Sequence, residues 1–126
     1  MGVRRVVPEI QSDAIELSRD FYEALGLEEV TDLGWVVTMA APGNPSAQLT
    51  LLGRDDTAPA QPDVTIEVDD VDAVYAQVLG GGWEVVHPIR DEPWGVRRFF
   101  VRDPNGRVVN VLAHRALGDG DGTPAA

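Results

Sequence analysis

Hydrophobic and polar positions follow two different periods along the chain, and the period changes in the same order in its two halves. In the first half, residues 3–11 alternate as in a strand, and residues 14–25 then repeat every three to four positions as in a helix. Asp13 and Glu16 form a capping-box pattern at the start of this helix, and Gly26 predicts its end. The apolar positions of the helix are Ala14, Leu17, Phe21, Ala24 and Leu25. Three further strands are predicted at 27–33, 34–41 and 47–53.

The second half repeats this order. Residues 64–68 predict a strand, Asp69 or Asp70 caps the following helix, and three glycines at 80–82 predict its end. The apolar positions of this helix are Val71, Val74, Tyr75, Val78 and Leu79, and three strands follow at 83–89, 96–102 and 107–113. The chain is therefore predicted to be α+β, with two βαβββ modules in a single domain over residues 1–116. We expect module one at 1–53, a polar, proline-rich linker at 54–62, module two at 63–116 and a disordered tail at 117–126.

Alternation assigns one face of each predicted strand to the helices and leaves a second face of mixed polarity. In the strand at 96–102 we assign Phe99 and Val101 to the helix-packed core, which leaves Arg98 and Phe100 on the other face. A mixed second face suits a sheet curled around a wet cavity, and a two-layer sandwich with this face in solvent is the alternative. The other positions assigned to the helix-packed face are Val6, Pro8, Ile10, Ala47, Leu49, Leu51, Val64, Ile66, Val68, Val109, Val111 and Ala113.

Composition limits the classes of protein to which this chain can belong. With 126 residues, 44% hydrophobic and 25% charged, the chain fits one soluble globular domain. A formal net charge of −11 argues against a nucleic-acid partner, permits a cationic ligand and favours solubility. The absence of cysteine excludes disulfides, thiolate metal sites and cysteine nucleophiles. No apolar run approaches the roughly 20 residues of a membrane span, and no signal peptide is evident, so we expect a cytoplasmic protein without a membrane partner.

Three stretches carry a resemblance to a known superfamily. They are FYEALGL at 21–27, EVDDVD at 67–72 and the pattern W-G-x-R-x-F-x-x-x-D-P-x-G at 94–106. With them, the sequence from about residue 3 to residue 115 resembles the vicinal-oxygen-chelate superfamily of glyoxalases, bleomycin-resistance proteins and extradiol dioxygenases. The resemblance implies paired βαβββ modules whose sheet curls around a ligand cavity, which agrees with the repeat found above.

The resemblance also implies four inward strand positions, which carry His or Glu ligands in metal-dependent members. In this sequence they fall on Val7, Gln48, Asp63 and Asn110. Catalytic zinc, iron or manganese needs about three imidazole or carboxylate ligands, and this set offers one carboxylate. Neither His87 nor His114 lies in a metal-binding spacing. We therefore expect no metal and no other cofactor.

The inward positions are instead candidates for binding a small molecule. Phe100 would contact an apolar part of the ligand, as implied by the fosfomycin-resistance branch, which has an aromatic residue at the matching position. Arg98 could pair with a carboxylate or phosphate, or form an internal salt bridge with Glu9, Asp63 or Glu67. Trp94 could cap the mouth of the cavity or anchor its own loop. The predicted ligand-binding residues are Glu9, Gln48, Asp63, Thr65, Glu67, Trp94, Arg98, Phe100 and Asn110.

Three hypotheses about function follow. The first is a metal-free small-molecule-binding protein, similar to the bleomycin-resistance branch, that sequesters a cationic or antibiotic-like ligand. The alternative is a metal-dependent lyase, isomerase or dioxygenase with an atypical ligand set. A third hypothesis is a metal-free enzyme with Glu9 or Glu67 as general base, and it leaves the catalytic residues unassigned. Because family members of this size are usually dimers, we also expect a homodimer.

Overall fold

The computed structural model describes residues 2–115, and the predicted tail at 117–126 lies outside them. The described residues form the predicted α+β fold, with eight strands and two helices in the order βαβββ–βαβββ. The first five elements are β1 (Val3–Gln11), α1 (Ile15–Ala24), β2 (Glu28–Asp32), β3 (Val36–Ala41) and β4 (Asn44–Leu52). The second five are β5 (Val64–Val68), α2 (Val71–Gly80), β6 (Val85–Asp91), β7 (Val96–Arg102) and β8 (Val108–His114).

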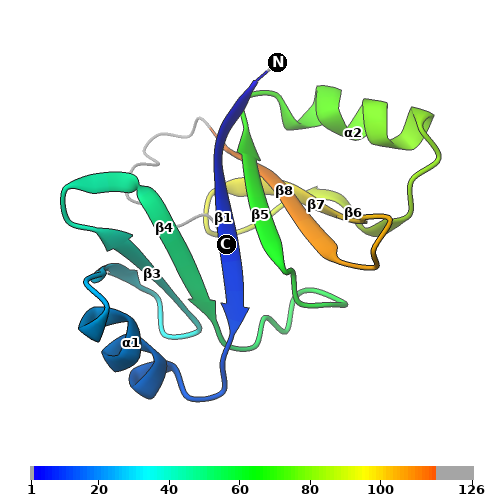
Figure 1. Ribbon diagram of the computed structural model, residues 1–126. Helices are drawn as coiled ribbons and strands as arrows, with labels where there is room; N and C mark the ends of the chain where they lie inside the picture. Colours follow the sequence, from blue (N-terminus) through cyan, green and yellow to red (C-terminus); the bar gives the residue numbers. More distant parts are fainter. Residues whose placement is uncertain (1, 116–126) are drawn as a thin grey trace.

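One mixed sheet contains all eight strands, in the order β2-β3-β4-β1-β5-β8-β7-β6. The first and last strands of each module pair in parallel, β1 with β4 and β5 with β8. The modules meet where β1 and β5 pair antiparallel, with Val7 opposite Thr65. Both helices lie on one side of this sheet, α1 on module one and α2 on module two (Figure 1). We call the opposite side the inner face.

The sheet curls toward its inner face without closing. Trp35 precedes β3 and Trp94 precedes β7, so the two residues belong near opposite ends of the strand order. Their rings nevertheless meet edge to face, with centroids 5.4 Å apart. The curl brings the inner face of module one close to that of module two, which places the side chains of both modules around one site.

Helix α2 packs on the sheet as the alternation predicted. Val71 lies in a buried cluster with Phe99 and Val111 from the sheet. The helix begins after Asp70, whose side chain accepts a hydrogen bond from the Ala73 amide at 3.1 Å, so this capping prediction is confirmed. Partly buried apolar residues complete the cluster and include Ile66, Val74, Tyr75, Val78 and Val101.

Helix α1 differs from α2, since none of its residues is buried. The apolar stripe that predicted the helix points away from the sheet, with Leu17 72%, Phe21 58% and Leu25 66% exposed. Contacts with the sheet come instead from Ile15 and Tyr22, which pack on the buried cluster of module one. The 3.6-residue period therefore identified the helix correctly but not the side that it buries.

The start of α1 also departs from the prediction. Its N-cap is Ala14, and no side chain caps the helix, so the capping box of Asp13 and Glu16 does not form. The hydroxyl of Ser12 accepts a hydrogen bond from the Ala14 amide at 3.0 Å instead. A serine two residues upstream thus binds an amide at the start of the helix through a local side-chain-to-backbone contact.

Part of the predicted helix-packed face remains uncovered. On β1, Val6 is 55% exposed and Pro8 is also exposed, because the two helices lie to either side of the central strands. Leu79, predicted as an apolar position of α2, is 54% exposed. The prediction that every strand buries one face against a helix is therefore wrong for the middle of the sheet.

The turn between β7 and β8 spans Asp103–Gly106, the last four residues of the pattern at 94–106. The Gly106 amide donates to the Asp103 carbonyl at 3.0 Å, and Gly106 adopts a φ of 87°, which favours glycine. The Asp103 carboxylate also accepts hydrogen bonds from the backbone amides of Asn105 and Arg107, at 2.8 and 2.9 Å. The turn fixes the register of β8 against β7 and thereby places Phe100 opposite Asn110.

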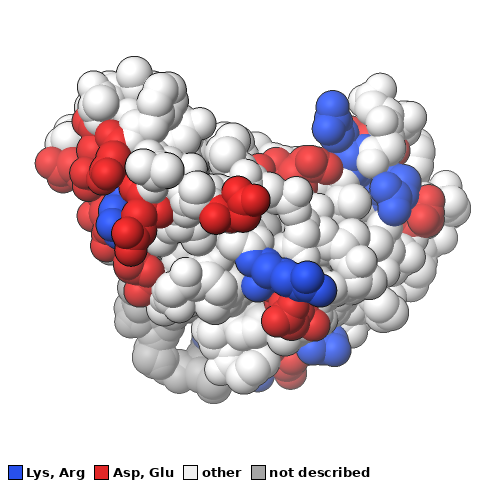
Figure 2. Space-filling view, turned by 90° about the horizontal axis from the view of Figure 1, so that it is seen from below, with Lys and Arg blue, Asp and Glu red and all other residues white. Residues whose placement is uncertain are grey.

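The surface carries the charge expected from the composition. Figure 2 shows acidic side chains gathered on the side of the molecule that holds α1. Within residues 2–115, no helix is long and apolar enough to cross a membrane.

Candidate functional site

A row of three inner-face residues crosses the middle of the sheet. Val7 of β1 is paired with Thr65 of β5, which is paired in turn with Asn110 of β8. All three side chains are buried. The row joins both modules, because β1 and β5 form the only strand pair shared between them in the described sheet.

A chain of hydrogen bonds runs from Asn110 through Thr65 to Glu9, with each donor on the Asn110 side. The Asn110 side-chain amide donates to the Thr65 hydroxyl at 3.1 Å, and the hydroxyl donates to Glu9 Oε2 at 2.7 Å. Because Thr65 uses its proton on Glu9, it can only accept from Asn110, which fixes the orientation of the Asn110 amide. The amide oxygen of Asn110 therefore remains available.

Four buried oxygen atoms beside this row have no hydrogen-bond partner among the described residues. They are Glu9 Oε1, Asn110 Oδ1, Thr38 Oγ1 and Thr50 Oγ1. Thr50 lies opposite both Glu9 and Thr38 in the sheet, so the atoms belong to neighbouring strands. We call Glu9, Thr38, Thr50, Thr65 and Asn110 the central cluster. Each buried, unsatisfied polar atom costs about 1–3 kcal/mol, so the central cluster is a place where a partner would stabilise the protein.

Glu9 is the one ionisable group of the central cluster. Its burial, at 5% exposure, raises the pKa of its carboxyl from 4.5 to about 8. The hydrogen bond from Thr65 and the charges of Arg5 and Arg98 oppose this rise without cancelling it. At neutral pH the carboxyl is therefore mostly protonated, and an arriving cation would favour its ionised form.

A second polar row lies on the inner face two residues further along β1 and β5. Arg5 donates to Glu67 at 2.6 Å and to Gln48 at 2.7 Å, and Glu67 Oε2 lies 2.8 Å from Nδ1 of His114. The hydrogen bond from His114 and the charge of Arg5 hold the pKa of Glu67 below its usual range, although burial opposes them. Glu67 is thus in an ion pair, and Gln48 is bonded to Arg5 and to the Pro45 carbonyl.

Arg98 occupies the inner face of β7 and is only 1% exposed. Its Nε donates to Glu92 at 2.7 Å, and its Nη2 donates to Asp55 at 3.0 Å and to Thr57 at 3.1 Å. The internal salt bridge weighed from the sequence therefore forms, but with Asp55 and Glu92 rather than with Glu9, Asp63 or Glu67. Asp55 comes from the linker, which folds against the inner face of module two.

Aromatic rings flank the Arg98 guanidinium. Its central carbon lies 4.9 Å from the ring centroid of Trp94 and 5.0 Å from that of Phe100. Phe100 also packs against the ring of His87, with centroids 5.0 Å apart. Trp94 packs with the buried pair Val96 and Leu112, so the Trp94 ring is part of the inner-face packing.

The positions that correspond to metal ligands do not fit a divalent ion. Val7 offers no ligating atom, and the Gln48 side chain is engaged by Arg5. Asp63 lies at the end of the sheet with its side chain 45% exposed, and it accepts a hydrogen bond from the Val108 amide at 2.8 Å. Nowhere in residues 2–115 are three His, Cys, Asp or Glu side chains grouped to hold an ion.

The structure thus sorts the nine predicted site residues. It brings Glu9, Thr65 and Asn110 together, places Gln48 and Glu67 in the adjacent row, groups Trp94, Arg98 and Phe100, and sets Asp63 apart. Sequence reasoning missed five residues that lie on the inner face of the sheet or against it. Thr38 and Thr50 could have been found, because Thr50 shares the strand parity of Gln48; the others missed are Arg5, Asp55 and Glu92.

Comparison with known proteins agrees with this fold. The family model of the Glyoxalase/Bleomycin resistance protein/Dioxygenase superfamily matches residues 4–111, so the chain belongs to this superfamily. No curated protein matches the chain.

Solved structures share the fold at low sequence identity. A glyoxalase/bleomycin resistance protein/dioxygenase superfamily member from Vibrio splendidus 12B01 is 20% identical, with a TM-score of 0.68 over 89% of this chain and 99% of that one. A Mn(II)-bound glyoxalase from Novosphingobium aromaticivorans is 22% identical, with a TM-score of 0.58 over 98% of this chain and 44% of that one. At these identities the likeness concerns the fold alone.

Proposed function

We propose that this protein is a metal-free small-molecule-binding protein of its superfamily. Its ligand would present a cationic or hydrogen-bond-donating group to the central cluster. The observation that carries the proposal is the set of four buried oxygen atoms without a partner among the described residues. Oxygen acceptors, one of them on a carboxyl, match an ammonium, guanidinium or amide group.

The charge of the protein supports the same class of ligand. A formal net charge of −11 draws cations toward the surface and raises their local concentration. Inside, the carboxyl of Glu9 can release its proton when a cation arrives, which supplies a buried counter-charge. In the second polar row the charges of Arg5 and Glu67 are paired with each other, so Glu9 is the carboxyl that can respond to an arriving cation.

Metal-dependent chemistry is not part of this proposal. The residues at the family's ligand positions do not fit a catalytic divalent ion, as described above, and no step is assigned to one. The Mn(II) of the Novosphingobium glyoxalase is a property of that protein. Sequestration instead requires that a ligand be bound and recovered unchanged, which mass spectrometry of the released ligand would test.

The first experiment measures the binding of simple amines and guanidines, such as butylamine, agmatine and spermidine, by calorimetry between pH 6 and pH 8. If a cation binds the ionised form of Glu9, its affinity rises by up to about tenfold per pH unit below pH 8. Binding should also release close to one proton per site at the acidic end, which calorimetry in buffers of different ionisation enthalpy detects. Glu9→Gln should abolish both effects.

Glu16→Gln is the matched control, because Glu16 is an exposed carboxylate on α1 and the substitution makes the same chemical change away from the central cluster. Thr50→Val and Asn110→Leu should weaken binding without removing its pH dependence, since they leave Glu9 in place. Binding with the same affinity in the Glu9, Thr50 and Asn110 variants would refute the proposed site.

We further propose that the protein is a homodimer that buries the exposed stripe of α1. Leu17, Phe21 and Leu25 recur every four residues and lie on one side of the helix, largely exposed. An exposed apolar patch of this kind marks an interaction surface. In a two-fold dimer the same stripe of the second copy would cover it.

A further inference from the structure

Arg98 has the geometry of a carboxylate receptor. Its guanidinium lies between the rings of Trp94 and Phe100, and Glu92 fixes its Nε edge at 2.7 Å. The neighbouring nitrogen, Nη2, donates to the Asp55 carboxylate at 3.0 Å. A planar guanidinium held in this way presents donors in a fixed direction, which suits a carboxylate. We call this arrangement the Arg98 slot.

The two carboxylates of the slot are held very differently. Glu92 belongs to the tight connection between β6 and β7, where its amide donates to the Val96 carbonyl at 2.8 Å and its carbonyl accepts the Gly95 amide at 3.2 Å. Glu92 also pairs with Arg90 at 3.1 Å, so its charge is shared between two arginines. Asp55 lies in the linker, which has no regular secondary structure. Glu92 is therefore a fixed counter-ion of Arg98, and Asp55 is the one that can leave.

Most hydrogen bonds of the linker join residues within the linker. The Gln61 side chain accepts the Asp55 amide at 3.2 Å and donates to the Asp55 carbonyl at 3.3 Å, and Thr57 donates to the Asp55 carboxylate. The hydrogen bonds from residues 54–62 to other described elements all end on Arg98. The loop can thus move as a unit with the loss of hydrogen bonds to one side chain only.

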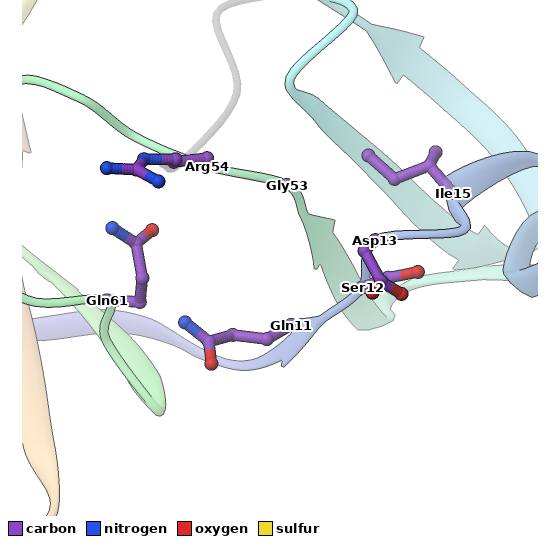
Figure 3. A pocket seen from close by; sticks show the side chains of 7 residues that line it. All are labelled: Gln11, Ser12, Asp13, Ile15, Gly53, Arg54 and Gln61. Atoms are coloured by element: carbon purple, nitrogen blue, oxygen red, sulfur yellow. The ribbon is translucent and has the colours of Figure 1, made fainter.

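Open space lies beside the linker and allows this movement. A hollow of about 700 Å³ separates the linker from the end of β1, and a second hollow of about 330 Å³ lies within the linker loop. Figure 3 shows the side chains of Gln11, Arg54 and Gln61 around the larger hollow, which they do not fill.

We propose that the Arg98 slot binds the carboxylate of a small ligand, and that Asp55 occupies this position as an internal substitute when the ligand is absent. As the ligand enters, the linker would move away from Arg98 and take Asp55 with it. The ligand carboxylate would then replace the Asp55 carboxylate as the partner of Arg98 Nη2. This inference goes beyond the proposed function, because it rests on a different group of residues. A ligand that satisfied both groups would carry a carboxylate as well as a cationic or donor group.

An internal competitor has a measurable consequence. Asp55 is tethered beside the slot, so a free carboxylate binds only in the fraction of molecules whose linker is open. A linker that is closed ten times as long as it is open weakens the apparent affinity about tenfold. Removing the Asp55 carboxylate abolishes this competition and takes one buried acceptor away from Arg98 Nη2, and a free carboxylate can then replace it.

The test compares sodium benzoate with sodium chloride at equal ionic strength, by calorimetry and thermal unfolding. Asp55→Ala should bind benzoate about tenfold or more tightly than the natural chain, and benzoate should raise its melting temperature. Asp56→Ala is the matched control, because Asp56 is exposed and pairs with Arg54 outside the slot. Adding Arg98→Met to Asp55→Ala should remove benzoate binding.

Asp55→Asn provides a second variant in case the alanine variant does not fold, since it removes the charge but keeps the size of the side chain. In the natural chain, benzoate should also speed hydrogen exchange at the amides of the linker, because a linker released from Arg98 is held only by its own hydrogen bonds. A folded Asp55 variant that binds benzoate no better than the natural chain would overturn the inference. Binding that survives Arg98→Met, or linker exchange that is unchanged at every benzoate concentration, would also overturn it. Amine binding at the central cluster is unaffected by these outcomes.

Discussion

The buried carboxyl of Glu9 should make the protein less stable as the pH rises toward neutrality. Burial raises the pKa of this carboxyl in the folded state from 4.5 to about 8. Between these values the folded protein holds a proton that the unfolded chain has released, so raising the pH favours unfolding. The contribution of Glu9 to stability is fully present below pH 4.5 and is lost as the pH rises through about 8.

The magnitude follows from the width of this interval. The free energy of unfolding falls by up to about 1.4 kcal/mol per pH unit, which gives about 5 kcal/mol between pH 4.5 and about pH 8. Glu9→Gln removes the titration and keeps a side chain that can accept the hydrogen bond from Thr65. We therefore expect the variant to gain stability relative to the natural chain progressively from pH 5 to pH 8.

Urea unfolding followed by tryptophan fluorescence at pH 5, 6, 7 and 8 measures this difference. Other groups that titrate in the interval cancel when the variant is compared with the natural chain at each pH. Asp55 and Glu67 do not interfere, because their pKa values are lowered and their contributions change in acid. A difference in stability that stays constant from pH 5 to pH 8 would refute the reasoning about Glu9.

Three further predictions follow from the contacts described above. Glu92→Gln leaves the buried Arg98 without its fixed counter-ion and should lower the free energy of unfolding by about 3–5 kcal/mol. Asp56→Asn removes one partner of an exposed pair and should change the free energy of unfolding by less than about 1 kcal/mol. Equal effects of the two variants in urea titrations would contradict the role of the Arg98 slot in stability. Protein purified without chelator should contain far less than one divalent ion per chain by elemental analysis, and EDTA should leave its melting temperature and amine affinity unchanged; a stoichiometric ion that EDTA removes, with loss of binding, would contradict this. Phe21→Arg should shift sedimentation from dimer to monomer, whereas Leu79→Arg on α2 should leave the dimer intact; a natural chain that sediments as a monomer at all concentrations would rule out the proposed dimer.

The fold could be predicted from the sequence because its signals are local. Alternation with period two located the strands, and the turn at Asp103–Gly106 fixed the last pair of strands in register. The assignment of Phe99 to the helix side, and of Arg98 and Phe100 to the inner face, is confirmed by the packing. Strand parity is a property of the backbone, so it survives whatever tertiary contacts form.

The partners of the inner-face residues could not be predicted in the same way. Arg98 finds Asp55 and Glu92, which come from a linker and a turn whose positions depend on the curl of the sheet. The side of α1 that contacts the sheet was also out of reach, because Leu17 and Tyr22 are both apolar enough to be buried. Choices of this kind depend on the relative positions of elements far apart in sequence, and the hydrophobic pattern does not contain them.

The single strand pair that joins the two modules has a consequence for assembly. Each module has its own helix and its own four strands, and β1 and β5 alone connect the two halves of the sheet in the described residues. The same antiparallel pair forms equally well between β1 of one chain and β5 of another, because the residues in contact are identical. Two chains can therefore exchange modules and rebuild two complete sheets, with the linker as the hinge. Shortening the linker until it no longer spans the distance from β4 to β5 should turn this exchange from an option into the only folded state.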